Sequence, residues 1–485
     1  MSERHRTRRH SATTAGLPDS SDVLSRTEVG DATDGLELTA VWRERVMAGF
    51  RPSSLDLRTD EFRDLVRRSR EVVLLAAVTG AITGVGVYFF EFIVTEVLLH
   101  ALYHADWRWG LVVPGLGLVA SALILHTVGS GASPATSDEY LRAFHDSEYP
   151  LRWRAFVGRI AAAITTLGSG GAMGLEGPSM YGGSAIGAMI QRRLPASFRG
   201  ADYRTLLVAG SAAGVAAIFK APATGAIFAL EVPFRDQMAR RMLLPALVAS
   251  ASGYLTFVAF TSTDPIFLVG SDERTASLFN YIDLLGAVLV GVGCAVGARM
   301  FSKLIRTAKA FTLRPIAIRL TVAGGLLTVL YLITRIITSE DWDPATGESL
   351  TLGSGYEVFA WLFDPQALWV LIAIFFLRMC ATATTLAGGG VGGVFIPLVV
   401  GGAIVGRIVG DVFNTVDPTL YVLLGIAAFL GAGYRVPLAA VMFVAETTGQ
   451  PGFIVPALFA SVAADLVMGE VSITTFQRSP VANPT

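Results

Sequence analysis

The sequence predicts an all-α polytopic membrane protein built from two inverted halves. Three observations favour this fold class. Of the 485 residues, 52% are hydrophobic and only 16% are charged, a balance typical of chains that cross a bilayer repeatedly. Long apolar runs recur along the chain, and 51 glycines permit close helix packing. Two segments of the first half also recur in the second.

The apolar runs mark the expected spans. They cover residues 71–103, 110–128, 155–195, 204–232, 242–261, 280–302, 317–337, 358–386, 391–414 and 418–468. Several are longer than one span requires and contain glycine or proline. We therefore expect tightly linked, tilted or discontinuous helices.

Composition divides the chain into four parts. Residues 1–68 are rich in Ser, Thr, Arg and Asp, which predicts a disordered cytoplasmic tail. Residues 69–270 form the expected first transmembrane half, and residues 271–478 form the second, inverted half. Residues 479–485 are a short cytoplasmic tail. No apolar segment follows the basic N-terminus at the spacing of a secretory leader.

Several function classes are excluded. The net charge of −1 does not favour nucleic-acid binding. None of the six histidines forms a His-Glu-x-x-His motif, and neither a Walker-type loop nor a nucleophile elbow with a base is present. We therefore expect no enzyme activity, cofactor or metal. The cysteines Cys294 and Cys380 lie in apolar runs, which predicts buried thiols without a disulfide.

The segment Gly174-Leu175-Glu176-Gly177-Pro178 carries the most information about function. A charged side chain at bilayer depth costs about 2.5–3.5 kcal/mol on insertion scales, so it points to a functional role. The glycines allow close backbone approach, and Pro178 suits the first turn of a helix. Because helix N-termini attract anions, Glu176 would occupy an anion position and could gate it. A helix-capping carboxylate without a gating role is the alternative.

This segment recurs in the second half with constant spacing. Gly393-Val394-Phe395-Ile396-Pro397 matches it, and a Gly-Gly pair and a further Gly follow both copies. A second pair of segments also matches: Phe219-Lys220-Ala221-Pro222 with Glu231, and Tyr434-Arg435-Val436-Pro437 with Glu446.

Flanking charges give the two halves opposite orientations. The loop after Glu231 contains Arg235, Arg240 and Arg241. The loop after Glu446, residues 447–453, has no Lys or Arg. The positive-inside rule therefore places the first loop in the cytoplasm, its counterpart outside, and both termini inside. Such inverted repeats place a substrate site near the bilayer midplane, between broken helices.

Together with Gly129-Ser130-Gly131, these segments make the chain similar to the CLC family of chloride channels and chloride/proton antiporters, over about residues 70–478. The prokaryotic type, which has no CBS domains, fits the short tail after Phe476. The resemblance implies about eighteen helices, a homodimer with one pore per subunit, and a central anion site.

The resemblance also implies site residues. Glu176 matches the gating glutamate, and Arg159 matches a buried basic residue near the pathway. The Ser130 hydroxyl would donate to the anion, with Ser133 as its competitor. The anion-binding set is Ser130, Gly131, Gly177, Gly393, Val394 and Phe395.

The inner part of the pathway departs from the family pattern. Val232 stands where the antiporters carry a proton-relay glutamate, and the adjacent Glu231 is the remaining relay candidate, with a helix cap or ion pair as its alternative role. Ile473 stands where the family carries a central tyrosine, so the tyrosine hydroxyl is lost. The hydroxyl of Thr474 or Thr475 could replace it. Leu175 replaces a basic residue.

These features predict transport of chloride or a similar small anion across the cell membrane through a pathway gated by Glu176. The losses at 232 and 473 favour passive conduction, as in a voltage-gated chloride channel. A chloride/proton antiporter is the alternative, and an intramembrane enzyme is a remote one. The expected partners are the anion, protons in the antiporter reading, the lipid bilayer and a second copy of the chain.

Overall fold

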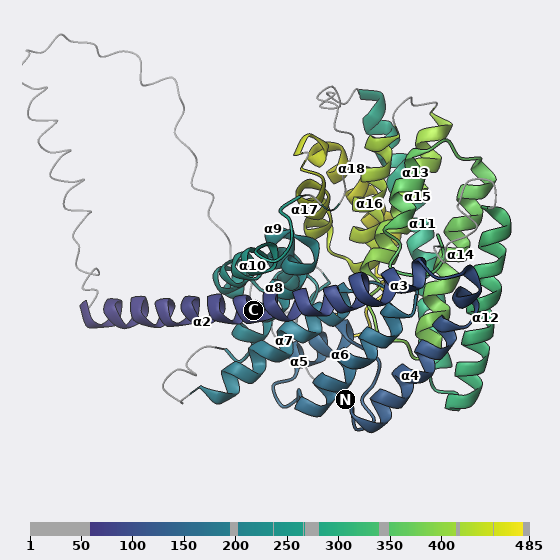
Figure 1. The fold of residues 1–485 in the computed structure, drawn as a ribbon. Coiled ribbons are helices and arrows are strands. Elements are labelled where there is room, and N and C mark those ends of the chain that lie inside the picture. The colour runs from purple at the N-terminus through teal and green to yellow at the C-terminus, as the bar shows by residue number, and fades with distance from the viewer. Residues whose placement is uncertain are drawn as a thin grey trace, which may run out of the picture. The chain divides into compact units, whose positions relative to one another are not determined.

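The computed structural model is described for residues 59–194, 202–235, 237–264, 266, 281–338, 349–413, 418–449 and 451–478. Within these residues the chain is helical and contains no β-strand, which confirms the all-α prediction (Figure 1). Residues 1–58 of the expected N-terminal tail, the expected C-terminal tail at 479–485 and the expected boundary between the halves near residue 270 lie outside the described residues. The contacts divide the chain into Met1–Val66 and Arg67–Thr485, and the site described below lies wholly in the second unit.

The helices follow in chain order. The first half contains α2 (Thr59–Glu91), α3 (His100–Tyr103), α4 (Val113–Thr127), α5 (Ser137–His145), α6 (Trp153–Gly168), α7 (Glu176–Arg193), α8 (Arg204–Phe219), α9 (Pro222–Glu231) and α10 (Leu243–Val258). The second half contains α11 (Tyr281–Phe311), α12 (Ile316–Ile337), α13 (Glu357–Phe363), α14 (Leu368–Ala387), α15 (Phe395–Val412), α16 (Thr419–Tyr434), α17 (Pro437–Thr448) and α18 (Ile454–Met468). A π-helical segment, Phe92–Leu99, joins α2 to α3, and short 3-10 turns lie at Trp107–Leu111, Arg240–Met242 and Pro451–Phe453. Because α2 begins at Thr59, the expected tail boundary at residue 68 falls inside this helix.

In the part of the chain that the structure describes, six helices are long and apolar enough to cross a membrane. They are Arg70–Tyr103, Arg240–Val258, Ile282–Phe311, Ile316–Ile337, Leu368–Ala387 and Phe395–Val412. Other apolar helices have only 10–17 residues. One of them, α8, ends at Lys220, which has a left-handed conformation (φ 48°), and Pro222 then begins α9. The expected discontinuous helices are therefore present. Cys294 is a buried free thiol as expected, whereas Cys380 is a free thiol that is only partly buried.

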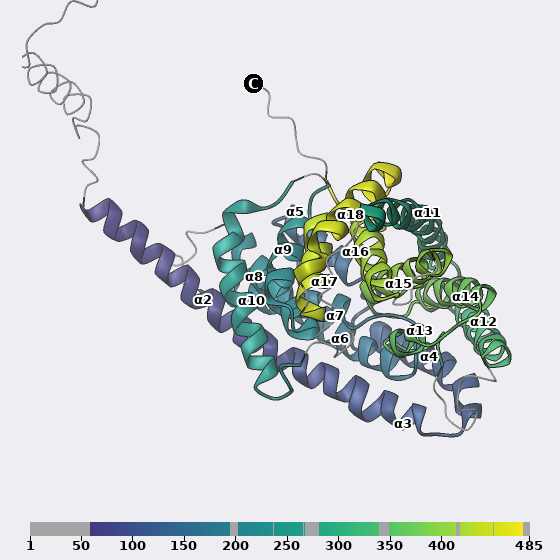
Figure 2. The same cartoon turned by 90° about the horizontal axis from the view of Figure 1, so that it is seen from above.

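The repeat is visible in the helix packing. Helix α7 packs on α8, and the matching helices α15 and α16 pack in the same way (Figures 1 and 2). A Cβ on Gly183 would collide with the carbonyl oxygen of Gly210, and the reverse is also true. Gly402 and Gly425 form the same reciprocal contact in the second half. Glycine is required at these positions because the two backbones touch, and the equivalence agrees with the inverted-repeat prediction.

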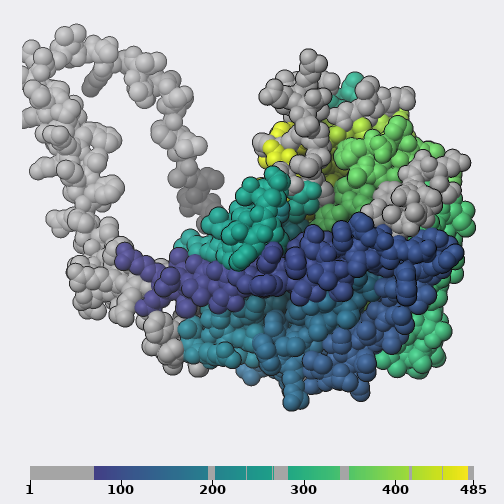
Figure 3. Space-filling model, viewed as in Figure 1, coloured from purple at the N-terminus to yellow at the C-terminus, as the bar shows by residue number. Residues whose placement is uncertain are grey.

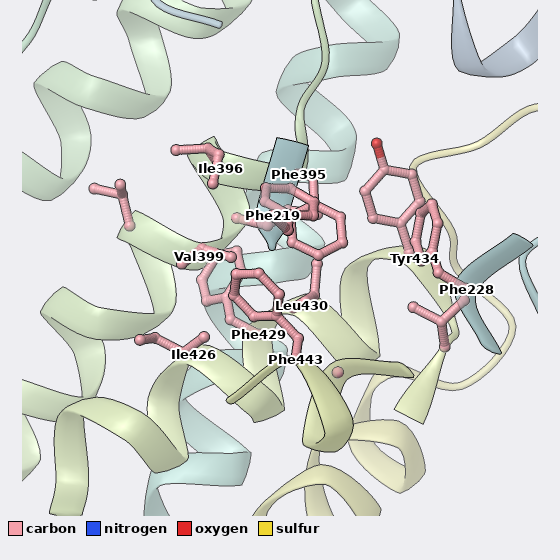
Figure 4. Packing of buried hydrophobic residues seen from close by; sticks show 14 of the residues in the cluster. Phe219, Phe228, Phe395, Ile396, Val399, Ile426, Phe429, Leu430, Tyr434 and Phe443 are labelled. Carbon is pink, nitrogen blue, oxygen red and sulfur yellow. The ribbon is translucent and has the colours of Figure 1, made fainter. Parts of the chain in front are cut away.

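An aromatic cluster lies where the two halves meet. Phe395 of α15 packs against Phe219 of α8 with ring centroids 4.5 Å apart, and against Phe228 and Phe443 at 5.3 and 4.9 Å (Figure 4). Helices of both repeats thus fix the N-terminus of α15. On the face shown in Figure 3, the purple-to-blue segment that includes α2 runs across the surface below α10, in teal.

Candidate functional site

The N-termini of α7 and α15 meet through a pair of backbone hydrogen bonds. The N–H of Gly174 donates to the carbonyl of Gly393 at 2.9 Å, and the N–H of Gly393 donates back at 2.7 Å. These two residues form an isolated antiparallel bridge. A Cβ on either glycine would collide with the Glu176 carboxylate. The repeated glycines are therefore needed to bring two helix N-termini and one carboxylate together.

Glu176 is the first residue of α7, and its side chain reaches across to the other repeat. Its Oε1 accepts a hydrogen bond from the backbone N–H of Phe395 at 2.6 Å, and the N–H of Ile396 also faces the carboxylate. The residue is 3% exposed, and Oε2 has no hydrogen-bond partner within the described residues. The carboxylate thus takes the position that a free anion would take at the N-terminus of α15.

A cavity of about 190 Å³ adjoins this junction. It contains backbone donors from the second repeat and hydroxyl groups from both repeats. Its polar and backbone lining includes Ser133, Thr136, Ser137, Gly393, Val394 and Tyr434. Helix α5 begins at Ser137, so a third helix N-terminus faces the same space. Several helix ends and hydroxyl groups give the cavity the donors that an anion requires.

Ser130 is not brought to this cavity. It is exposed and has a left-handed backbone (φ 54°) in the turn that ends α4. The N–H of Gly131 donates to the carbonyl of Leu125 at 2.9 Å, which commits the Gly129–Gly131 segment to the helix end. The chain enters the cavity three residues later, at Ser133. Ser130 and Gly131 therefore do not line this cavity, whereas Ser133, the competitor of Ser130, does.

The other expected backbone residues are brought together. Gly177 lies against Gly393, where a Cβ would meet the Thr136 hydroxyl and the Gly393 Cα. The Thr136 hydroxyl donates to the carbonyl of Gly392 at 3.2 Å. Val394 and Ile473 both line the cavity, as does Thr474. Ile473 is only 4% exposed and presents no hydroxyl.

Arg159 is buried in an ion-pair network that lies beside the cavity. It pairs with Glu139 at 2.8 Å and donates to the carbonyl of Ser133 at 2.9 Å. It also donates to the Tyr181 hydroxyl at 2.8 Å, and Tyr149 donates to Glu139 at 2.5 Å. The network fixes the loop that enters the cavity at Ser133. Glu139 compensates the charge of the Arg159 guanidinium. Arg159 holds this loop in position and does not itself line the cavity.

Glu231 and Glu446, the two glutamates at equivalent repeat positions, each cap a helix N-terminus in the other half. Glu231 of α9 accepts from the N–H groups of Leu438 and Ala439, at 3.3 and 3.0 Å, at the start of α17. Glu446 of α17 accepts from Ala223 and Thr224, at 2.8 and 2.7 Å, at the start of α9. These carboxylates satisfy helix N-termini that would otherwise lack partners.

Glu231 also lines a second cavity of about 320 Å³, with Arg235, Arg240 and Arg435. The neighbouring Val232 is completely buried. Its carbonyl accepts from the Gln477 side chain at 2.9 Å. Glu231 therefore faces a cavity lined by arginine side chains, whereas Val232 is packed in the protein interior.

Sequence reasoning missed several residues of the main cavity. Tyr434, Ser137 and Thr136 line it, and Lys309 of α11 pairs with Asp138 at 2.6 Å at its edge. The Thr-Ser-Asp-Glu run after Pro134 was the available signal, because such runs begin helices. Within the described residues, no group of three or more His, Cys, Asp or Glu side chains is placed to hold a metal.

Comparisons with known proteins identify the family. Residues 116–469 match the model of the family described as voltage gated chloride channel. The H(+)/Cl(-) exchange transporter ClcA of Salmonella paratyphi B is 26% identical over 442 residues, covering 84% of this chain and 88% of the relative. The ClcA protein of Salmonella typhi gives the same values.

Solved structures show the same fold. A slow cyanobacterial Cl-/H+ antiporter aligns with a TM-score of 0.68 at 21% identity, covering 82% of this chain and 94% of the other. A CLC-type fluoride/proton antiporter aligns with a TM-score of 0.69 at 20% identity, covering 84% and 98%. The family model covers most of the chain, and the helices, the repeat and the glycine-flanked glutamate agree with it. This chain is a multi-pass membrane protein and belongs to the CLC family of voltage-gated chloride channels and chloride/proton antiporters, prokaryotic type.

Proposed function

We propose that the protein exchanges chloride, or a similar small anion, for protons across the cell membrane. The observation that carries this proposal is the hydrogen bond from the Phe395 N–H to Glu176 Oε1 at 2.6 Å. A carboxylate on these donors competes with an anion for them, and it leaves more readily when protonated. One residue can therefore bind the proton and block the anion in turn. The expectation of passive conduction gives way to its antiporter alternative, because the relatives are named exchange transporters.

Anion and proton movement are measured together in the decisive experiment. The purified full-length protein is placed in liposomes with an outward chloride gradient and a weakly buffered exterior. The proposal expects proton uptake driven by chloride exit, in a fixed ratio. Glu176→Gln should continue to move chloride without moving protons. Chloride flux without any proton movement in the unmodified protein would overturn the exchange mechanism.

Passive conduction through the same pathway is the second candidate. It is favoured by the buried Val232 and the apolar Ile473, which put no titratable side chain at these two positions. Under combined chloride and pH gradients, a channel gives a reversal potential that follows chloride alone. A reversal potential that shifts with the pH gradient supports exchange and refutes the channel.

Glu231 is the proposed inner proton-binding group. It lines the second cavity together with Asp465, although its hydrogen bonds to the N-terminus of α17 also engage it. Glu231→Gln keeps a hydrogen-bond acceptor for the α17 N–H groups but removes the titratable site. We expect slower proton transport with a smaller effect on chloride flux, whereas the exposed Glu148→Gln should change neither. Unchanged coupling in Glu231→Gln would exclude this route.

We further propose a homodimer with both termini in the cytoplasm. The arginines that follow Glu231 support the orientation, and the family resemblance supports the dimer. Single cysteines introduced in the 235–241 loop and near residue 450 should react with an impermeant thiol reagent from opposite sides. Mass measurement in detergent should give twice the mass of the chain. Labelling of both cysteines from one side, or a monomeric mass, would contradict these assignments.

A further inference from the structure

Tyr434 is a buried hydroxyl-bearing residue at the end of α16 that the transport mechanism above does not use. It is 1% exposed. Its ring packs at right angles on Phe228, with centroids 5.5 Å apart, and lies 6.2 Å from Phe395. In Figure 4 the hydroxyl points away from the other labelled rings. The aromatic cluster thus holds the ring and leaves the hydroxyl outside the apolar packing.

The Tyr434 hydroxyl lies where the junction of α7 and α15 adjoins the main cavity. Tyr434 lines this cavity together with Ser137 and Val394. Its oxygen is within interaction range of the Ser137 side chain, the Val394 N–H and the Glu176 carboxylate. The hydroxyl therefore adjoins both the N-terminus of α15 and the cavity.

The repeat shows that packing alone does not require the hydroxyl. Phe219 occupies the equivalent position at the end of α8, and its ring packs on Phe395 at 4.5 Å. A phenyl ring therefore fills the same architectural place in the first half. A buried hydroxyl has an energetic cost unless it makes hydrogen bonds, so its presence only in the cavity-facing copy indicates a polar partner there.

The backbone holds Tyr434 firmly in this place. Its carbonyl accepts from the Gln477 side chain at 2.7 Å, and the next residue, Arg435, is left-handed (φ 58°) and ends the helix. The N–H of Ile473 donates to the carbonyl of Gly433 at 3.1 Å. The C-terminal segment is therefore bound to the end of α16, where Ile473 supplies an apolar wall and Tyr434 supplies the hydroxyl.

We propose that the Tyr434 hydroxyl, assisted by Ser137, donates a hydrogen bond to the transported anion and sets which anions bind. This inference rests on the proposed function, since it concerns the same pathway. The anion class is a small monovalent ion such as chloride or bromide. The O–H group supplies the donor that position 473 lacks, from a different helix.

Tyr434→Phe tests this with the loss of one oxygen atom. Chloride and bromide binding to the purified full-length protein is measured by calorimetry in detergent. Because a hydrogen bond to a charged group is strong, we expect about a tenfold loss of chloride affinity or more. The ratio of chloride to bromide affinity should also change, because the smaller ion gains more from a hydroxyl donor. Ser137→Ala should weaken binding less, since it acts on the anion through Tyr434 in part.

Tyr421→Phe is the matched control. Tyr421 lies on the same helix, and its hydroxyl faces Asp283 at 3.4 Å, away from the cavity. It should leave both affinities unchanged. Thermal unfolding of both variants reports any loss of folding. Equal anion affinity and equal selectivity in Tyr434→Phe and the unmodified protein would overturn this proposal. Absence of anion binding in the unmodified protein would instead overturn the proposed function.

Discussion

Replacing Glu176 with alanine should make the protein bind chloride more tightly. In the structure Glu176 Oε1 accepts a hydrogen bond from the Phe395 N–H at 2.6 Å, and the residue is 3% exposed. An incoming anion must therefore first displace the carboxylate. A hydrogen bond to a charged group contributes about 1.5–3 kcal/mol. Since about 1.4 kcal/mol corresponds to a tenfold change, chloride affinity should rise by about 10- to 150-fold.

Calorimetric titration of the full-length protein with chloride measures this change. In the unmodified protein, the carboxylate is displaced more easily when protonated, so chloride binding should take up protons and strengthen as the pH falls. The heat of binding should therefore depend on the ionisation enthalpy of the buffer. Both dependences should disappear in Glu176→Ala. Equal affinity in the two proteins, or a pH dependence that survives the substitution, would refute the competition between carboxylate and anion.

Three further predictions concern the supports of the site, and each is measured by thermal unfolding in detergent. Glu446→Ala removes the acceptor of three hydrogen bonds at the start of α9 and should cost about 1–3 kcal/mol, while the exposed Glu148→Ala should change stability little; equal melting would exclude the cap. Gly183→Ala forces α7 from α8 and should destabilise clearly, whereas Gly325→Ala, which has open space, should be neutral or stabilising by up to about 1 kcal/mol. Arg159→Met removes the closer of two cations from the buried Glu139 and leaves only Arg142, at 3.7 Å; it should cost up to about 3–5 kcal/mol, and a loss below 1 kcal/mol would contradict the ion pair.

The junction of α7 and α15 could be predicted because its signals are local and repeated. A glycine-flanked glutamate in an apolar run, found again as a glycine-rich segment at constant spacing, indicates two helix N-termini related by symmetry. The sequence could not show that Glu176 reaches Phe395 in the other repeat. That contact joins residues 219 positions apart, and side-chain direction across such a distance depends on how the two halves pack.

Ser130 lies outside the cavity because of the local backbone structure at the end of α4. Gly129-Ser130-Gly131 has the composition of a ligand loop, but the hydrogen bond from Gly131 to Leu125 makes it a helix end. The chain then reaches the cavity at Ser133. Residue types alone could not show which of the two serines reaches the cavity, because that depends on how the turn after α4 directs the chain.

The sequence by itself determined the membrane class, the inverted repeat and the glutamate at its centre, because these depend on composition, hydrophobic run length and repeated spacing. The tertiary structure decided which groups line the anion cavity and which act as caps. Glu231 and Glu446 bind across the two halves, and Tyr434 faces the cavity where its repeat partner Phe219 only packs. The physical reason is that repeat symmetry fixes where helices end. Whether a helix end binds an anion or a capping side chain depends on its burial and on which side chains of the other half can reach it.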